Sequence, residues 1–289
     1  MGSMAPALRD SYLARLGLDA GPPSVEALFG IHRAHVERVP YETLWIHLGD
    51  TWGVAADEAV ERIAMRGRGG YCFHLNGACS ELLRSLGYDV VRHVGGVHGP
   101  DGATADAMAN HLVLTVRDLP NDANPGGVWY VDVGLGDALH EPLPLLAGTY
   151  DQGPFRLVLE PTPVGVGDWH LTHDPKGWFA GMAWRSEPAE MGAFAERNQF
   201  LSTSPESGFV QVLTAARRDA TGVDVLQGLR RRRIGAGEME STITSRRELI
   251  EVLRDDFDLD LGAPDDPAFD ALWARACEAH RAWEAEQNP

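Results

Sequence analysis

The chain has 289 residues, with 25 Lys and Arg against 42 Asp and Glu, and its formal net charge is −17. A chain this acidic is a poor partner for a nucleic-acid backbone or an anionic membrane surface, so we expect neither as a partner. Apolar residues make up 44% of the chain, which suffices for a sizeable core. The sequence contains no long apolar run and no signal-like start, so the chain is expected to be cytoplasmic.

The first predicted unit is helical. Apolar residues recur at spacings of three and four over residues 11–87, and the pattern breaks at 21–23, Pro40 and Gly87. We therefore expect a helical bundle over residues 5–88.

A β-rich part follows. Short apolar segments are bounded by Gly, Pro, Asn and Asp, which is typical of strands and turns. The predicted strands are 90–97, 112–116, 128–133, 155–159 and 178–184. We assign residues 89–201 to this part.

The last predicted unit, residues 202–289, is mixed. It begins with strand-like segments and continues with helical patterns at 244–257 and 267–283. No internal repeat is found, and the whole chain is predicted to be of the α+β class.

Three cysteines, Cys72, Cys79 and Cys277, are too few and too unevenly spaced for a disulfide framework or a structural zinc site. We expect no metal. Cys79 lies on the apolar face of a predicted helix, and Cys277 lies in another helical segment. Both are predicted to be structural.

Cys72 falls in the first turn of a predicted helix, directly after Gly69 and Gly70. At a helix start the backbone N–H groups and the helix dipole favour a thiolate, and the same N–H groups can bind an oxyanion. A small buried hydrophobe is the competing interpretation, and position alone does not separate the two.

A thiol nucleophile needs a base, and the base needs a group that fixes its tautomer. His111 opens a predicted strand, on the face opposite the leucines of that strand. Asp132 interrupts an apolar strand, where a carboxylate needs a partner. A histidine at a strand end and a carboxylate that caps the following turn are the competing interpretations. Three further histidines, His74, His93 and His98, remain candidates for the base.

Four segments in order resemble motifs of the arylamine N-acetyltransferases. RGGYCFHLN at 68–76 resembles the RGG-x-C motif, and VPYETL at 39–44 resembles VPFENL. DVGLG at 132–136 resembles DVGFG, and NQFLSTSPESGF at 198–209 resembles the N-x-(Y/F)-x-ST-x-P-x-S-x-F segment. The resemblance extends over nearly the whole chain, from residue 12 to residue 261.

The resemblance implies a three-part fold with a helical bundle, a β-barrel and an α/β lid around a cysteine-protease-like core. It also implies a catalytic triad, which maps onto Cys72, His111 and Asp132. In this family an acyl group passes from acetyl-CoA to the cysteine and then to the nitrogen of an aromatic amine, hydrazine or hydroxylamine, in a ping-pong mechanism. Coenzyme A and a small aromatic amine or hydrazine are thus the implied partners, and a homodimer is left open.

The resemblance also suggests residues that bind the acceptor and the cofactor. Those residues are Tyr41, Gly96, Val97, Leu135, Thr203 and Phe209. The sequence departs from the family pattern at three positions. His74 replaces a usual Glu, Thr43 an Asn, and Leu135 a Phe, and the last change implies an acceptor pocket of altered shape.

Arg230 to Arg233 form a basic run in an acidic chain. They are predicted either to hold the phosphates of coenzyme A or to form a solvated strand edge.

Other functions stay open. An amide synthase that takes its acyl chain from a carrier protein belongs to the same family. A transglutaminase-like cysteine hydrolase and a non-catalytic binding module are the remaining alternatives.

Overall fold

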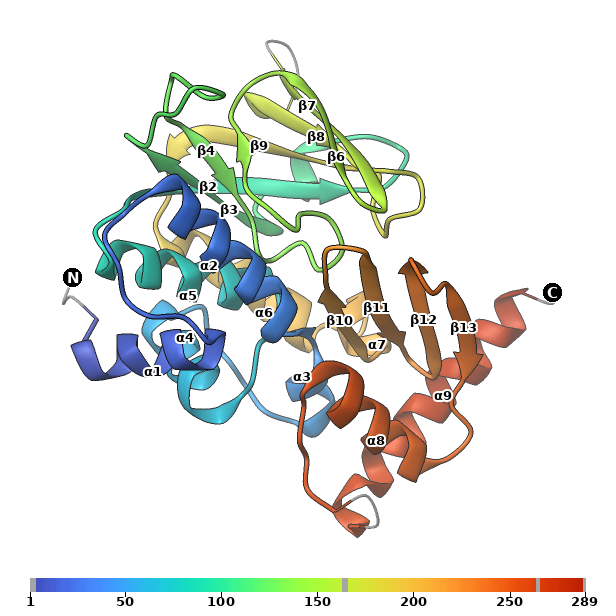
Figure 1. Ribbon diagram of the computed structural model, residues 1–289. Coiled ribbons are helices and arrows are strands. Elements are labelled where there is room, and N and C mark those ends of the chain that lie inside the picture. Colours follow the sequence, from blue (N-terminus) through green and yellow to red (C-terminus); the bar gives the residue numbers. More distant parts are fainter. Residues whose placement is uncertain (1–3, 163–165, 264–265, 288–289) are drawn as a thin grey trace.

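The N-terminal part is helical. The computed structural model describes residues 4–162, 166–263 and 266–287 (Figure 1). Its first helices are α1 (Pro6–Leu16), α2 (Val25–Arg38), α3 (Leu44–Leu48), α4 (Ala56–Arg66) and α5 (Cys72–Ser85). Ser24 caps α2, since its hydroxyl accepts from the Ala27 N–H at 3.1 Å. The chain leaves α5 through Gly87, whose φ is +94°.

Helix α5 is the central element of this part. Most of its side chains are buried, including Leu75, Cys79 and Leu82, which have no exposed surface. It packs between α4 and the first strands of the barrel. Because both flanks of α5 are covered, its start is held firmly in position.

An antiparallel, nearly closed β-barrel forms the middle part. Its strand order is β5-β4-β3-β2-β9-β8-β7-β6. The strands are β2 (Asp89–His98), β3 (His111–Arg117), β4 (Trp129–Val131), β5 (Leu143–Pro144), β6 (Gly148–Gln152), β7 (Phe155–Pro161), β8 (Trp169–Thr172) and β9 (Gly181–Pro188). Almost all of β3 is buried, because the barrel core covers one face and α5 the other. The short 3₁₀ turn η1 (Ala105–Ala107) lies between β2 and β3.

The C-terminal part combines a second sheet with helices. The sheet has the order β1-β10-β11-β12-β13, and its first strand, β1 (Tyr41–Glu42), comes from the N-terminal part. The other elements are η2 (Met191–Phe194), α6 (Ala195–Thr203), α7 (Gly208–Gln211), β10 (Thr214–Arg218), β11 (Gly222–Gln227), β12 (Arg230–Gly235), β13 (Met239–Thr242), α8 (Arg246–Phe257), η3 (Pro267–Phe269) and α9 (Asp270–Gln287). Helices α8 and α9 bury one face of this sheet in a separate apolar core.

The architecture confirms the α+β class and the three-part fold. The predicted strand at 178–184 is wrong at its start, because β9 begins only at Gly181 and the preceding residues form a turn. Helix α6 extends across residue 201, where the sequence suggested the end of the β-rich part. Within the described ranges, no helix is long and apolar enough to cross a membrane.

Candidate active site

Cys72 is the first residue of α5. The first bonds of that helix are donated by the N–H groups of His74 and Leu75 to the Tyr71 carbonyl, at 2.9 and 3.0 Å. The N–H groups of Cys72 and Phe73 therefore lie at the open end of the helix. The Cys72 side chain is buried, and its Sγ lies 3.6 Å from the Asn110 carbonyl oxygen.

Gly134 packs directly on the cysteine. A Cβ at Gly134 would lie 2.7 Å from the Cys72 Cα, so any side chain at this position would displace the start of α5. This contact explains a glycine two residues after Asp132, and it holds the Asp132 loop against Cys72.

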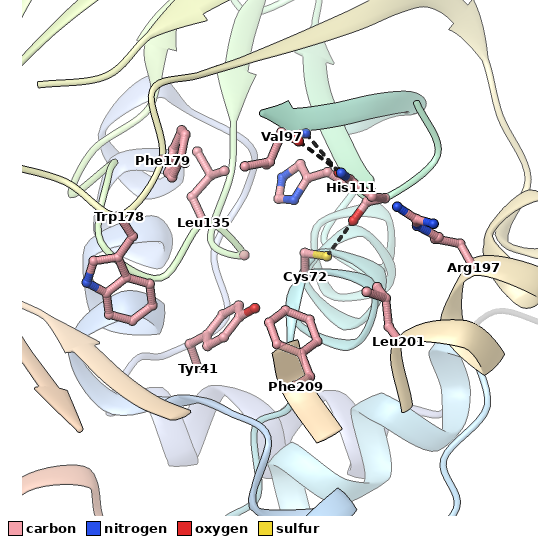
Figure 2. A pocket seen from close by; sticks show the side chains of 12 residues that line it. Tyr41, Cys72, Val97, His111, Leu135, Trp178, Phe179, Arg197, Leu201 and Phe209 are labelled. Atoms are coloured by element: carbon pink, nitrogen blue, oxygen red, sulfur yellow. Dashed lines mark hydrogen bonds between the residues drawn. The ribbon is translucent and has the colours of Figure 1, made fainter. Parts of the chain in front are cut away.

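His111 opens β3, and Asp132 directly follows β4. The His111 Nε2 lies 2.8 Å from Asp132 Oδ2, and both side chains are buried. Burial lowers the pKa of His111, but the Asp132 carboxylate and Cys72 raise it more, and it reaches about 10. Because Nε2 is bound to Asp132, Nδ1 is the ring nitrogen left for Cys72, and Figure 2 shows both side chains at the same cavity.

Each oxygen of the Asp132 carboxylate has two hydrogen-bond partners. Oδ1 accepts from Asn76 Nδ2 at 2.7 Å and from the Gly134 N–H at 3.0 Å. Oδ2 contacts His111 and accepts from the Tyr130 hydroxyl at 3.0 Å. The carboxylate thus caps the turn and also orients the histidine. The turn-capping and the catalytic interpretations of Asp132 therefore do not exclude each other.

Asn76, one turn after Cys72, joins the helix to both strands. It also donates to the Leu112 carbonyl at 2.6 Å and accepts from the Val133 N–H at 2.9 Å. Asn76 was not among the predicted site residues, although its place four residues after the cysteine puts it on the same helix face.

A cavity of about 250 Å³ opens beside Cys72 and His111 (Figure 2). Four residues suggested by the family resemblance line it, namely Tyr41, Val97, Leu135 and Phe209. Six further lining residues were not predicted: Asn110, Gly134, Trp178, Phe179, Arg197 and Leu201. Trp178 and Phe179 were missed because their apolar character was attributed to a strand, whereas they lie in the turn before β9.

Two suggested residues lie outside the lining. Gly96 pairs with Ala183 between β2 and β9, and a Cβ there would lie 2.6 Å from the Ala107 carbonyl oxygen. Thr203 ends α6, and its hydroxyl donates to the Gln199 carbonyl at 2.7 Å. Gly96 therefore allows η1 to approach β2, and Thr203 bonds within its own helix.

The other cysteines lie in packed surroundings. Cys79 has no exposed surface, and burial raises the pKa of its thiol to about 12, with the Asp132 charge adding to the effect. Cys277 packs against the core under the second sheet. Neither lines the cavity.

His74 points away from the cavity. Its Nε2 contacts the Gly53 carbonyl oxygen at 3.1 Å, and its ring packs against Trp45 and Trp52. Burial lowers the pKa of His74 to about 3, and the nearby Arg62 adds to the effect. The imidazole is therefore neutral.

His93 and His98 also have partners outside the cavity. The Nε2 atom of His93 lies 2.8 Å from the Thr115 hydroxyl. That of His98 lies 2.9 Å from the His170 Nε2. His111 is thus the histidine that lines the cavity with Cys72.

The arginine run on β12 is mostly neutralised. Arg230 pairs with Glu240, Arg231 with Asp256, and Arg233 with Asp219 and Asp224. Arg232 has no carboxylate partner among the described residues, and its Nε is buried without a hydrogen bond there.

Arg232 lines a groove of about 750 Å³ between β12, β13 and the barrel, opposite Lys176. Asp137 links this groove to the cavity, because it accepts from the Trp178 N–H at 2.8 Å and attracts Arg232 electrostatically. The turn before β9 therefore contributes Trp178 to the cavity and Lys176 to the groove.

Comparisons with known proteins agree with this geometry. A family profile described as N-acetyltransferase matches residues 24–265. The arylamine N-acetyltransferase of Mycolicibacterium smegmatis is 32% identical over 87% of this chain and 91% of its own length. The human arylamine N-acetyltransferase 1 is 25% identical over 87% of this chain and 94% of its own.

Solved structures give the same result. The M. smegmatis enzyme superposes with a TM-score of 0.79 at 29% identity, covering 93% of this chain and 97% of that one. The Mycobacterium marinum arylamine N-acetyltransferase in complex with CoA has a TM-score of 0.79 at 26% identity, covering 93% and 98% of the two chains. The chain therefore belongs to the arylamine N-acetyltransferase family.

Proposed function

We propose that this protein transfers an acetyl group from acetyl-CoA to the nitrogen of an arylamine, arylhydrazine or arylhydroxylamine, through an acyl group carried on Cys72. The observation that carries the proposal is the contiguous set of Cys72, His111 and Asp132 beside a cavity walled by aromatic side chains. Membership of the family and the CoA complex of the M. marinum relative support the choice of donor.

In the first half-reaction the Cys72 thiolate attacks the thioester carbonyl of acetyl-CoA. The developing oxyanion is stabilised by N–H groups at the start of α5, where the helix dipole adds to the effect. His111 gives its proton to the sulfur of the departing coenzyme A, and the acetyl group stays on Cys72.

In the second half-reaction the amine enters the vacated cavity. Tyr41, Trp178 and Phe209 offer faces and edges against which an aromatic ring packs. His111 takes the proton from the attacking nitrogen, and the C–S bond to Cys72 breaks to release the amide. The cycle is ping-pong because donor and acceptor use the same cavity in turn.

Incubation of the protein with acetyl-CoA should acetylate Cys72 and release one equivalent of free coenzyme A, and an arylhydrazine should then make the release continuous. Intact-protein and peptide mass spectrometry locate the adduct, and a thiol reagent follows the coenzyme A. If no adduct forms and the hydrazine has no effect, acetyl transfer is excluded and the carrier-protein amide synthase or a binding module is favoured. Release that continues without any amine would indicate a hydrolase.

Arg232 and Lys176 fit the phosphates of coenzyme A. The Nε–H of Arg232 is an unused donor of the kind that binds a phosphate oxygen, and Lys176 lines the same groove. The three neighbouring arginines are paired with carboxylates. Of the four arginines in the run, we therefore propose only Arg232 as a phosphate ligand.

Arg232→Gln is expected to raise the KM for acetyl-CoA about tenfold, because one charge-assisted contact to phosphate is lost. The measurement is the initial rate of hydrazine acetylation against acetyl-CoA concentration. Arg230→Gln removes the same charge from the same strand and should change KM by much less, since Arg230 is paired with Glu240. Equal effects of the two variants, or none, would refute the assignment.

A further inference from the structure

Arg197 is an arginine that lines the catalytic cavity. It lies on α6, in the first turn, and its guanidinium carbon stacks 5.0 Å from the centre of the Phe200 ring. Its Nε is buried and has no hydrogen-bond partner in the described part of the chain, where no carboxylate pairs with it either. The guanidinium is therefore held beside the cavity with its Nε–H unused.

The surroundings make this arrangement unusual. Most of the cavity wall is apolar, with Tyr41, Leu135, Phe179 and Phe209 among its residues. A guanidinium that is partly removed from water is stabilised by a counter-charge, and this acidic chain supplies one at other partly buried arginines. The half-buried Arg68, for example, is bound to Glu42 at 2.9 Å.

The position of Arg197 relative to the sulfur is also informative. Figure 2 shows Arg197 and Leu201 on one side of Cys72, and Tyr41 and Trp178 on the other. A ring packed on the aromatic side presents its nitrogen to Cys72. The acyl group on the sulfur, or a substituent close to the reacting nitrogen, is then the part of a substrate that extends toward Arg197.

We propose that Arg197 is a carboxylate-recognition site, and that this enzyme prefers a substrate that carries a carboxylate near the reacting centre. The planar guanidinium matches a carboxylate through two parallel N–H···O bonds, and the apolar wall strengthens them by excluding water. The inference rests on the proposed acetyl-transfer function and specifies its substrate class. The carboxylate belongs either to the acyl group, as in a dicarboxylic monothioester, or to the acceptor, as in 2-aminobenzoate.

The two half-reactions separate these sources. In the donor arm, the first release of coenzyme A without an acceptor is compared for malonyl-CoA and for propionyl-CoA, its uncharged analogue of similar size. In the acceptor arm, acetyl-CoA is the donor, and 2-aminobenzoate, whose carboxylate is adjacent to the reacting nitrogen, is compared with its methyl ester. Each arm gives a ratio of kcat/KM for the charged over the neutral substrate.

Arg197→Gln should lower that ratio about tenfold or more in one arm, and Arg197→Glu should lower it further, because a charge-assisted pair is first lost and then made repulsive. The arm that responds identifies the source of the carboxylate. Arg185→Gln is the matched control, since it removes the same charge from an exposed site on β9 and should leave both ratios unchanged.

Ratios that are unchanged by Arg197→Gln in both arms would overturn the inference, even if every neutral substrate is turned over. A ratio that falls equally in the Arg185→Gln control would also overturn it, because the effect would then come from net charge. A wild-type protein that acylates from none of these donors would instead refute the proposed function, and with it this inference.

Discussion

Cys72→Ala is expected to abolish acyl transfer, with a loss of about 10⁴-fold or more in kcat/KM, because Cys72 provides the thiol that lines the cavity. The variant should still fold, since Ala is a good helix former and the side chain removed is small. Hydrazine-dependent release of coenzyme A measures the loss, and circular dichroism checks the fold.

Cys79→Ala is the matched control on the same helix. Its thiol is buried and its pKa is raised to about 12, so it contributes packing and no reactivity. We expect a loss of about 1 kcal/mol of stability from the small cavity and near-normal turnover. A folded Cys79→Ala variant as inactive as Cys72→Ala would mean that the nucleophile is misassigned.

Asp132→Asn is expected to lower kcat by about 10³- to 10⁴-fold while leaving the fold in place, because the amide cannot stabilise an imidazolium and favours the wrong tautomer of His111. Tyr130→Phe removes one hydrogen bond to the same carboxylate and leaves its charge in place, so kcat should fall by less than about tenfold. Equal losses in the two variants would point to general damage at the site rather than to the charge of Asp132.

The pH dependence of stability tests the pairing of His111 with Asp132. The pKa of His111 is raised from its ordinary 6.5 to about 10, so its pairing with Asp132 stabilises the fold fully below about pH 6.5 and is lost as the pH rises through about 10. The imidazolium therefore persists at neutral pH, and the free energy of unfolding, measured by urea denaturation, should fall as the pH rises from about 7 to about 10. In Asp132→Asn, which lacks the charged partner of His111, this fall should be smaller.

Local patterns were enough to predict the elements that carry the site. The cysteine after two glycines and the apolar face that ends at Gly87 locate α5, and the alternation after His111 locates β3. Both signals depend on residues close together in the sequence. The expected juxtaposition of Cys72, His111 and Asp132 needed the family resemblance as well.

Contacts between distant segments could not be read from the sequence. Trp178 looks like a strand residue in an apolar run, and only the turn before β9 places it at the cavity. Arg197 precedes a recognised motif without belonging to it, so nothing local indicates that its guanidinium reaches Cys72's surroundings. The ion pairs that neutralise most of the arginine run likewise depend on strand register and on α8.

The two-residue strand β1 connects the C-terminal sheet to the loop that precedes Cys72. Tyr41 pairs with Ala216 of β10, while the Glu42 N–H donates to the Gly70 carbonyl at 2.9 Å, two residues before Cys72. Thr43 adds a reciprocal pair of bonds to Thr214 at the same edge. A hinge motion of the sheet is therefore expected to displace the backbone that sets the position of the Cys72 sulfur, which couples the C-terminal part to the nucleophile.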